Sequence, residues 1–333
     1  MPRLPIELSY QVVSLELHEP VRIAGHTFHD IPCIQVQLQR GKHVGHGEAA
    51  GVFFLQDDPP GMPVQLDSVR GALREGLARE QLRRLLPPCG ARNALDCALW
   101  DLEARESGQP AWQLAGLPAP RPVLTTFTLS IDEPGVMAER AKRGLHGQGS
   151  ALKLKLAGDA TVDIARVRAV RQARPDAWIG VDANRSYTPA SILSLLPVLV
   201  DCGVELLEQP FARGRERDMA SVRFPLPVAA DESCLHLGEL DALAELFDMV
   251  NIKLDKCGGL TDGLSMARRA RELGMGVMVG CMGGTSLAMA PAFVLAQVCD
   301  VVDLDGPTIL ASDCTPCVRY DAGTLDCPTD LWG

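Results

Sequence analysis

The spacing of apolar segments after residue 118 constrains the fold more than any other feature of this sequence. Short apolar runs recur there at intervals of 22 to 27 residues, and each is followed by a helical stretch and a turn. A strand, a helix and two connecting loops together need about that many residues. The sequence therefore predicts an α/β fold, a modified (β/α)8 TIM-like barrel, over residues 119–305. The eight runs end near Thr128, Lys155, Asp182, Glu208, Asp231, Lys253, Gly280 and Asp303.

Residues 1–118 follow a different pattern and predict a separate α+β capping domain. Apolar and polar residues alternate over 13–17 and 34–38, which is typical of antiparallel strands. Residues 65–87 and 91–106 then show the spacing of two amphipathic helices. Strands followed by helices in one short stretch indicate a small α+β unit.

Charge and hydropathy exclude several classes of partner. A net charge of −10 disfavours binding to nucleic acid or to an anionic membrane surface. No apolar run approaches the roughly 18 to 20 residues that span a bilayer. The first residues carry no apolar signal-peptide core. We therefore expect a soluble, cytoplasmic protein with neither a nucleic acid nor a membrane as its partner.

The 11 cysteines are an odd number and lie mostly in apolar segments. Reduced, buried thiols in a cytosolic protein are the simplest interpretation. Residues 314–317 form a CxxC motif, but no second pair accompanies it, which disfavours a structural zinc site. The motif lies within residues 306–333, a segment rich in Pro, Asp and Gly that we expect to return to the capping domain.

Lysines stand at two of the predicted strand ends. In Leu152-Lys153-Leu154-Lys155-Leu156, the alternation of a strand places both lysines on one face and the leucines on the other. Both faces of a parallel barrel strand are covered, so leucines packed on the helices leave Lys153 and Lys155 pointing inward. The same alternation turns Lys253 inward. The alternative is an amphipathic strand with its lysines in solvent.

Three carboxylates end three consecutive predicted strands, at Asp182, Glu208 and Asp231. Carboxylate oxygens with room for water and substrate suit a hard divalent ion, most simply Mg²⁺. Taken singly, each residue could instead be a helix N-cap or a solvated loop residue. Lys155 and Lys253 lie two strands to either side of Glu208, which suits acid-base chemistry if burial, the ion and neighbouring lysines lower a lysine pKa.

These motifs resemble the enolase superfamily, in particular its Lys-Lys (muconate-lactonizing-like) subgroup and the dipeptide epimerases within it. The resemblance covers nearly the whole chain. It rests on Gly45-His46-Gly47-Glu48-Ala49, on Asn93-Ala94-Leu95-Asp96, on the Lys-x-Lys pair, on Asp182-Ala183-Asn184, Glu208-Gln209-Pro210 and Asp231-Glu232-Ser233, and on Asn251-Ile252-Lys253-Leu254.

The resemblance implies a magnesium-dependent epimerase of a small-molecule dipeptide. Lys155 and Lys253 would transfer the α-proton, and Lys153 would tune Lys155. The Asp303-Leu304-Asp305 motif would hold the ammonium of the substrate, although it could also be a solvated acidic loop. Because the default substrates by resemblance are L-Ala-D-Glu and L-Ala-L-Glu from peptidoglycan turnover, Arg22 could bind an acidic side chain or be an ordinary exposed arginine. Thr128 could contact substrate.

Rival functions share the same residues. Muconate cycloisomerases, o-succinylbenzoate synthases and N-acylamino acid racemases of this subgroup use equivalent lysines and ligands. A non-catalytic, metal-stabilised binding protein is a further alternative. A racemase with a late histidine base is disfavoured, because the last histidine is His236. The roles of Gly284 and Asp255, where relatives often differ, stay open, as does assembly into a homo-oligomer; Asp255 could shift the pKa of Lys253 or pair with Lys256.

Overall fold

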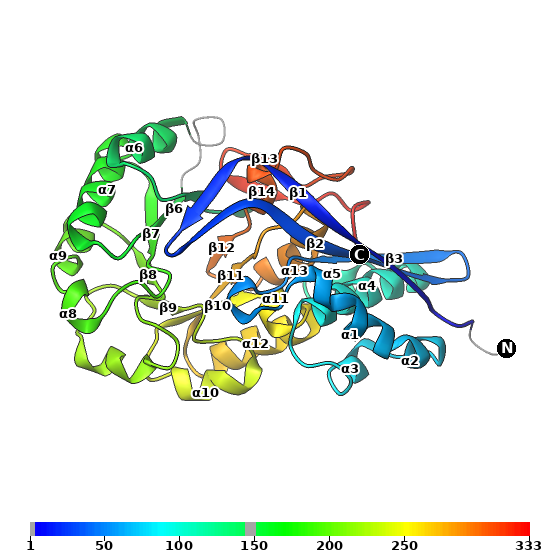
Figure 1. Cartoon of the computed structure of the whole chain (residues 1–333). Coiled ribbons are helices and arrows are strands. Elements are labelled where there is room, and N and C mark those ends of the chain that lie inside the picture. The colour runs from blue at the N-terminus through cyan, green and yellow to red at the C-terminus, as the bar shows by residue number, and fades with distance from the viewer. Residues whose placement is uncertain (1–3, 144–150) are drawn as a thin grey trace.

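A computed structural model describes residues 4–143 and 151–333, and it contains the predicted barrel (Figure 1). Eight parallel strands form one sheet in chain order. The sheet closes where Thr126 N–H, just before the first of these strands, donates to Val302 O on the last at 2.9 Å. The strands are β5 (Phe127–Leu129), β6 (Ala151–Lys155), β7 (Trp178–Asp182), β8 (Leu206–Glu208), β9 (Val228–Ala230), β10 (Met249–Lys253), β11 (Gly276–Gly280) and β12 (Val301–Asp303).

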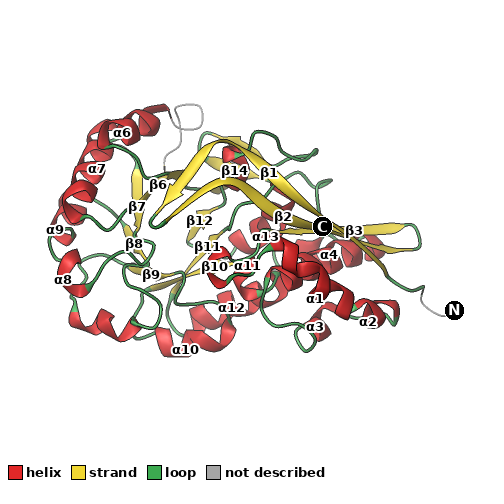
Figure 2. Ribbon diagram, in the orientation of Figure 1, coloured by secondary structure: helices red, strands yellow, loops and turns green. Residues whose placement is uncertain are grey.

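Helices follow the strands and cover the outside of the barrel (Figure 2). The alternation is irregular after β8, where the connection holds a 3-10 helix instead of an α-helix. The helices of the barrel are α6 (Pro134–Arg143), α7 (Ala160–Ala173), α8 (Pro189–Ile192), α9 (Leu196–Asp201), η3 (Glu216–Ser221), η4 (Leu237–Glu239), α10 (Leu240–Leu243), α11 (Leu254–Cys257), α12 (Leu260–Glu272), α13 (Ser286–Ala296) and η5 (Gly306–Ile309).

Strand alternation divides the barrel interior into an apolar floor and a polar mouth. Leu206, Ala229 and Met278 form a small buried cluster inside the barrel. Glu208 and Asp231 lie two residues after Leu206 and Ala229, so they share the inward face one step nearer the carboxyl end. The apolar layer fills the barrel, and the charged residues gather at the end where barrel enzymes place their sites.

The N-terminal unit is an antiparallel sheet backed by helices. Its strands are β1 (Glu7–Ile23), β2 (His26–Arg40) and β3 (His43–Ala49), paired in that order. The prediction of one continuous helix over 65–87 is wrong, because the chain breaks first at Val69, with φ −102° and ψ 0°, and again at Gly76, which adopts φ +92°. The structure has η1 (Phe53–Leu55), η2 (Pro59–Gly61), α1 (Met62–Ser68), α2 (Arg70–Arg74), α3 (Arg79–Leu82), α4 (Gly90–Ser107) and α5 (Ala111–Leu114).

Helix α4 confirms the second predicted cap helix and contributes to two hydrophobic cores. Leu95 and Leu102 pack in the core beneath the cap sheet. Cys97 and Trp100, on the other side of the helix, belong to the core of the barrel. The cap sheet lies so close to α4 that a Cβ on Gly47 of β3 would lie 2.0 Å from the carbonyl oxygen of Ala94. The cap is therefore packed onto the barrel through a shared helix.

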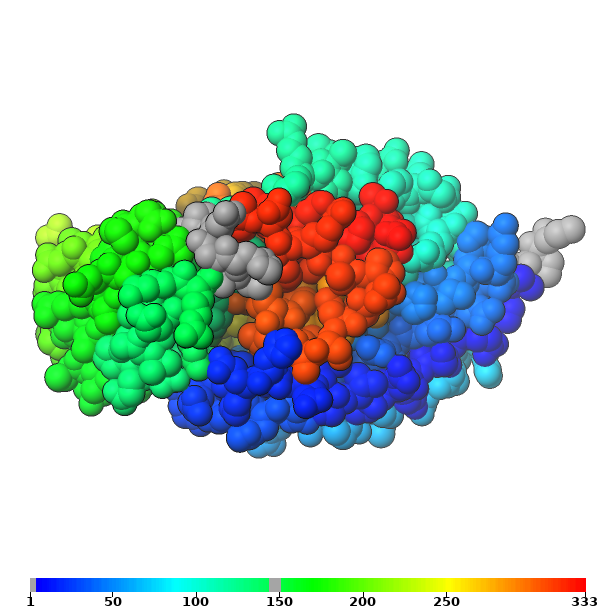
Figure 3. All heavy atoms as spheres, turned by 90° about the horizontal axis from the view of Figure 1, so that it is seen from above, coloured from blue at the N-terminus to red at the C-terminus, as the bar shows by residue number. Residues whose placement is uncertain are grey.

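The C-terminal segment contacts both other parts of the chain. Strand β13 (Arg319–Asp321) pairs with β14 (Thr324–Asp326), which in turn pairs with β4 (Val123–Leu124) at the start of the barrel. On the cap side, Ala311 N–H donates to Glu16 O at 2.8 Å and Trp332 Nε1–H donates to His46 O at 3.0 Å. Figure 3 shows the orange and red C-terminal surface against the blue N-terminal strands. The boundaries at 118 and 305 stay predictions.

Among the described residues, no helix is both long and apolar enough to span a membrane.

Candidate active site

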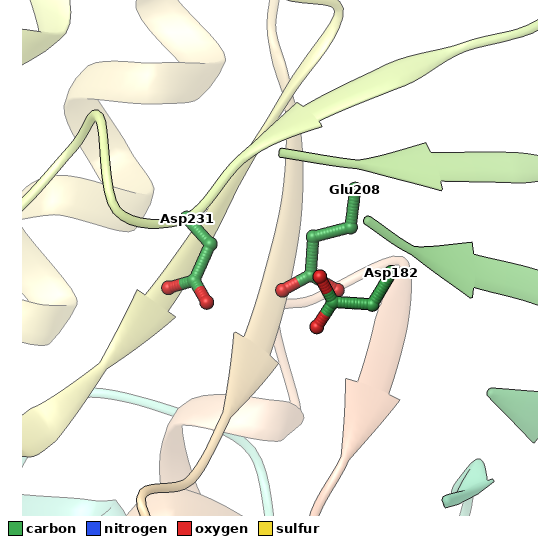
Figure 4. Close-up of side chains that lie close together, drawn as sticks. All are labelled: Asp182, Glu208 and Asp231. Atoms are coloured by element: carbon green, nitrogen blue, oxygen red, sulfur yellow. The ribbon is translucent and has the colours of Figure 1, made fainter. Parts of the chain in front are cut away.

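Three buried carboxylates meet at the mouth of the barrel (Figure 4). Asp182 ends β7, Glu208 ends β8, and Asp231 follows β9 by one residue. One carboxylate oxygen from each lies within 4.8 Å of the others. All three are oxygen donors, and Asn251 Nδ2–H fixes the orientation of Glu208 by donating to its Oε1 at 2.8 Å. This hard donor set fits Mg²⁺, which prefers carboxylates and water.

The charges at this site are arranged around the same three residues. Burial and the neighbouring Asp182 raise the pKa of Glu208 to about 7. Burial also opposes ionisation of Asp231, but Lys253 and Lys256 outweigh it and hold the pKa of Asp231 well below its usual range. Buried carboxylates at such close range need cations, which the nearby lysines supply in part and a divalent ion would supply more fully.

Lys155 and Lys253 contact the carboxylates from opposite sides of the barrel. Lys155 Nζ lies 2.6 Å from Asp182 Oδ2 on β7, and Lys253 Nζ lies 2.7 Å from Asp231 Oδ2. Their strands, β6 and β10, are separated by three others in an eight-stranded barrel. At Lys253, burial favours the neutral amine, but Asp231 outweighs it and raises the pKa.

Lys153 joins the carboxylate cluster to the last strand. Its side chain is only 4% exposed, so the alternative of a solvent-facing strand is wrong. The ammonium lies 2.7 Å from Glu208 Oε2, 2.7 Å from Asp303 Oδ2 and 3.3 Å from Asp182 Oδ2. Burial disfavours this charge, but Asp303 and the other carboxylates raise the pKa of Lys153 well above its usual value. Lys153 is therefore held as a cation.

Asp303 and Asp305 are buried and are not a solvated acidic loop. Thr126 Oγ1–H donates to Asp303 Oδ1 at 2.6 Å, and Thr128 N–H donates to Asp305 Oδ2 at 2.6 Å. Burial and the neighbouring Asp303 raise the pKa of Asp305 to about 6. Both carboxylates line the cavity above the lysines, together with Thr128. A cation bound in this cavity, in addition to Lys153, would reduce the repulsion between Asp303 and Asp305.

Comparison with known proteins agrees with this geometry. Residues 6–116 match the model of the mandelate racemase / muconate lactonizing enzyme N-terminal domain, and residues 136–329 match the enolase C-terminal domain-like model. The chain belongs to the enolase superfamily. An L-Ala-D/L-Glu epimerase of Escherichia coli is 39% identical over 93% of this chain and 96% of the relative. An N-acetyl-D-glutamate racemase of a Pseudoalteromonas species is 37% identical over 76% and 79%.

Solved structures of the superfamily superpose on nearly the whole chain. An Agrobacterium tumefaciens protein with homology to dipeptide epimerases, with bound sodium and L-Ala-L-Glu, covers 99% of this chain and is itself covered to 100%, with a TM-score of 0.94 and 35% identity. A dipeptide epimerase of Enterococcus faecalis, complexed with Mg and L-Leu-L-Tyr, gives a TM-score of 0.89 and 28% identity over 98% and 97%.

Arg22 is a predicted site residue that the structure turns away from the cavity. Its side chain is 48% exposed, and Nη1 lies 3.7 Å from Asp132 Oδ2. Within the described residues, Val21 and Ile23 line the cavity and Arg22 does not. A strand turns alternate side chains to opposite faces, so the neighbours of Arg22 face inward when Arg22 faces outward.

Asp255 and Gly284 connect this superfamily barrel to its cap. Asp255 Oδ1 accepts a hydrogen bond from Gly51 N–H at 2.8 Å, whereas the Lys256 ammonium contacts Asp231 Oδ1 at 2.6 Å, so the alternative in which Asp255 pairs with Lys256 is wrong. Near Gly284, the Thr285 N–H donates to the buried Glu48 of the cap at 2.6 Å. A Cβ on Gly284 would lie 3.0 Å from Glu48 Oε1, so this glycine allows the close contact.

Lys256 is a site residue whose contact the sequence reasoning missed. Its Nζ lies 2.6 Å from Asp231 Oδ1 and donates to Asn251 O at 2.9 Å. Its position three residues after Lys253 could have indicated this contact, because the short helix α11 turns Lys256 back toward the end of the barrel. Lys256 therefore fixes the orientation of Asp231 from the side opposite Lys253.

Proposed function

We propose that this protein is a magnesium-dependent dipeptide epimerase that moves the α-proton of a dipeptide between two lysines. The observation that carries the proposal is the placement of Lys155 and Lys253 on opposite strands, each in contact with the carboxylate cluster. A single base would suffice to remove a proton, but inversion needs a second proton donor on the opposite face. The names of the relatives support the same reaction.

The residues of this chain divide the work of binding and proton transfer. Asp303 and Asp305 would hold the N-terminal ammonium of the dipeptide, which places the peptide beside β12. One lysine would remove the α-proton, and the other would return a proton to the opposite face of the planar α-carbon. When bound to Asp182, Glu208 and Asp231, Mg²⁺ would neutralise the carboxylates and stabilise negative charge on the substrate carboxylate. Lys153 would hold Asp303 and Glu208 in place.

The buried aspartate pair favours a dipeptide over the other substrates of the subgroup. A cycloisomerase or o-succinylbenzoate synthase substrate carries no ammonium for Asp303 and Asp305 to bind. Racemisation of an N-acylamino acid is the second candidate, because one relative of 37% identity is an N-acetyl-D-glutamate racemase. Its substrate also lacks the ammonium.

The test is incubation of the protein with Mg²⁺ and dipeptides in D₂O, read by mass spectrometry and NMR. We expect deuterium at the α-carbon of the C-terminal residue and formation of the epimer. Lys155→Ala and Lys253→Ala should each lower epimerisation by about 10²- to 10⁴-fold, whereas Lys42→Ala, at an exposed position on the cap, should not. Exchange into N-acylamino acids but into no dipeptide would establish the second candidate instead.

Three finer parts of the proposal rest on composition and resemblance. We propose that the enzyme works in the cytoplasm, without nucleic acid or membrane partners. Assembly into a homo-oligomer is part of the same proposal, to be tested by light scattering. A role in peptidoglycan turnover depends on acceptance of an acidic dipeptide such as L-Ala-D-Glu.

A further inference from the structure

The cap closes the cavity with apolar side chains. The residues of this roof are Val21, Ile23, Phe28, Ile31, Phe53 and Phe54. In the β1–β2 hairpin, Val21 pairs with Phe28 and Arg22 pairs with Thr27. Directly paired residues share a face of the sheet. The hairpin therefore turns Val21 and Phe28 toward the cavity and Arg22 and Thr27 away from it.

Aromatic contacts fix this roof between two separate segments of the cap. The rings of Phe28 and Phe53 lie 5.1 Å apart at 86°, and those of Phe53 and Phe54 lie 5.4 Å apart at 88°. His26 stacks on Phe53 at 4.9 Å. Edge-to-face packing of this kind orients rings as well as burying them. The hairpin tip and the loop that carries η1 thus form one apolar surface.

Cations near the cavity are already engaged by carboxylates. Among the described residues that line the cavity, the cationic side chains are Lys153, Lys155 and Lys253, and each contacts a buried carboxylate at its floor. Arg185 contacts one ring of the roof, with its guanidinium 4.9 Å from the centre of the Phe54 ring, and its Nε lies 3.0 Å from Glu232 Oε1. Among the described residues, the roof therefore has no cationic side chain that could bind a carboxylate on the substrate side chain.

The direction of the substrate side chain follows from the proposed reaction, on which this inference rests. At a planar α-carbon the carboxylate, the nitrogen and the side chain lie in one plane, and the two lysines approach from above and below it. With the carboxylate toward Asp182, Glu208 and Asp231 and the nitrogen toward Asp303, the side chain points away from the floor. It must then meet the roof.

We infer that this enzyme acts on dipeptides whose epimerised residue carries an apolar side chain, and that Val21, Ile23, Phe28, Phe53 and Phe54 determine this specificity. An apolar side chain gains by leaving water and packing on these rings. A glutamate side chain would leave water with no partner for its charge, which is costly. The substrate class thus differs from the acidic dipeptide that the sequence resemblance makes the default.

The experiment compares kcat/KM for α-deuterium exchange with L-Ala-L-Leu, L-Ala-L-Phe, L-Ala-L-Glu and L-Ala-L-Lys. We expect the two apolar dipeptides to exceed the two charged ones by about 10- to 100-fold. Ile23→Arg would place a cation in the roof and should shift the ratio of L-Ala-L-Glu to L-Ala-L-Phe toward L-Ala-L-Glu by about 10-fold or more. Thr27→Arg adds the same charge to the outer face of the hairpin and should leave the ratio unchanged.

The outcomes separate the specificity from the reaction. A wild-type preference for L-Ala-L-Glu overturns the inference and leaves the proposed epimerase function intact. A preference for L-Ala-L-Lys also overturns it, and points to Glu232 as the partner of the side chain. An equal response to Ile23→Arg and Thr27→Arg contradicts the assignment of the roof. Absence of exchange with all dipeptides removes the proposed function, and the inference falls with it.

Discussion

The free energy of unfolding of the Asp255→Asn variant, measured relative to that of the wild type, should increase as the pH rises. Asp255 is buried where the barrel meets the cap, and Gly51 N–H donates to it at 2.8 Å. Burial raises the pKa of this carboxyl from its ordinary value of 3.8 to about 7, because the hydrogen bonds that it accepts do not offset the loss of water.

The sign and size of the effect follow from proton linkage. Between the unfolded pKa and the folded pKa, the native state keeps a proton that the unfolded state has released. The free energy of unfolding therefore falls by about 1.4 kcal/mol per pH unit as pH rises through this window. From about pH 5 to about pH 8 the loss at this one residue amounts to about 2–3 kcal/mol. An asparagine does not titrate, so Asp255→Asn escapes this loss.

Urea denaturation of both proteins at several pH values measures the difference. We expect the free energy of unfolding of Asp255→Asn, relative to wild type, to rise by about 2–3 kcal/mol between about pH 5 and about pH 8. Any change in the free energy of unfolding that comes from replacing the carboxyl group by an amide is the same at every pH. Asp58→Asn, at an exposed position in the cap segment that contains Gly51, controls for the change in net charge. Parallel stability curves for Asp255→Asn and wild type would refute the reasoning.

Two further substitutions test the metal site and the cap contact. Glu208→Gln should weaken Mg²⁺ binding by more than about 100-fold in titration calorimetry. Glu205→Gln, at an exposed position three residues earlier, is the control and should leave the affinity unchanged. An unchanged affinity in Glu208→Gln would show that Glu208 is not a metal ligand. Gly47→Ala should lower the free energy of unfolding by about 3 kcal/mol or more, because its Cβ would lie 2.0 Å from Ala94 O. Gly71→Ala, with open space around its Cβ, is the control, and equal stabilities would contradict the contact.

The barrel and the floor of the site were predictable because they depend on local alternation. A residue two positions from a buried inward residue also faces inward, so Lys153 and Asp182 could be placed from the strand pattern alone. The fold then brings parallel strand ends together without further information. The ends of the strands agree with the predicted positions to within one residue.

The contacts that the sequence could not supply join distant segments. Asp255 pairs with Gly51, 204 residues away, and no local pattern indicates this partner. The outward turn of Arg22 depends on the register of a hairpin, and a shift by one residue would have reversed it. The breaks in the predicted helix over 65–87 come from the backbone conformations of Val69 and Gly76, which the apolar spacing does not indicate.

The shared helix α4 has a consequence for how substrate enters. Because Leu95 belongs to one core and Trp100 to the other, swinging the whole cap open would expose both cores at once. That rearrangement would cost far more than the displacement of a hairpin tip. We therefore expect substrate to enter by displacement of the hairpin tip around Ile23 and the adjoining loop at Phe53, both of which line the cavity. Substitutions there should then change the rates of substrate binding and release as well as the substrate preference.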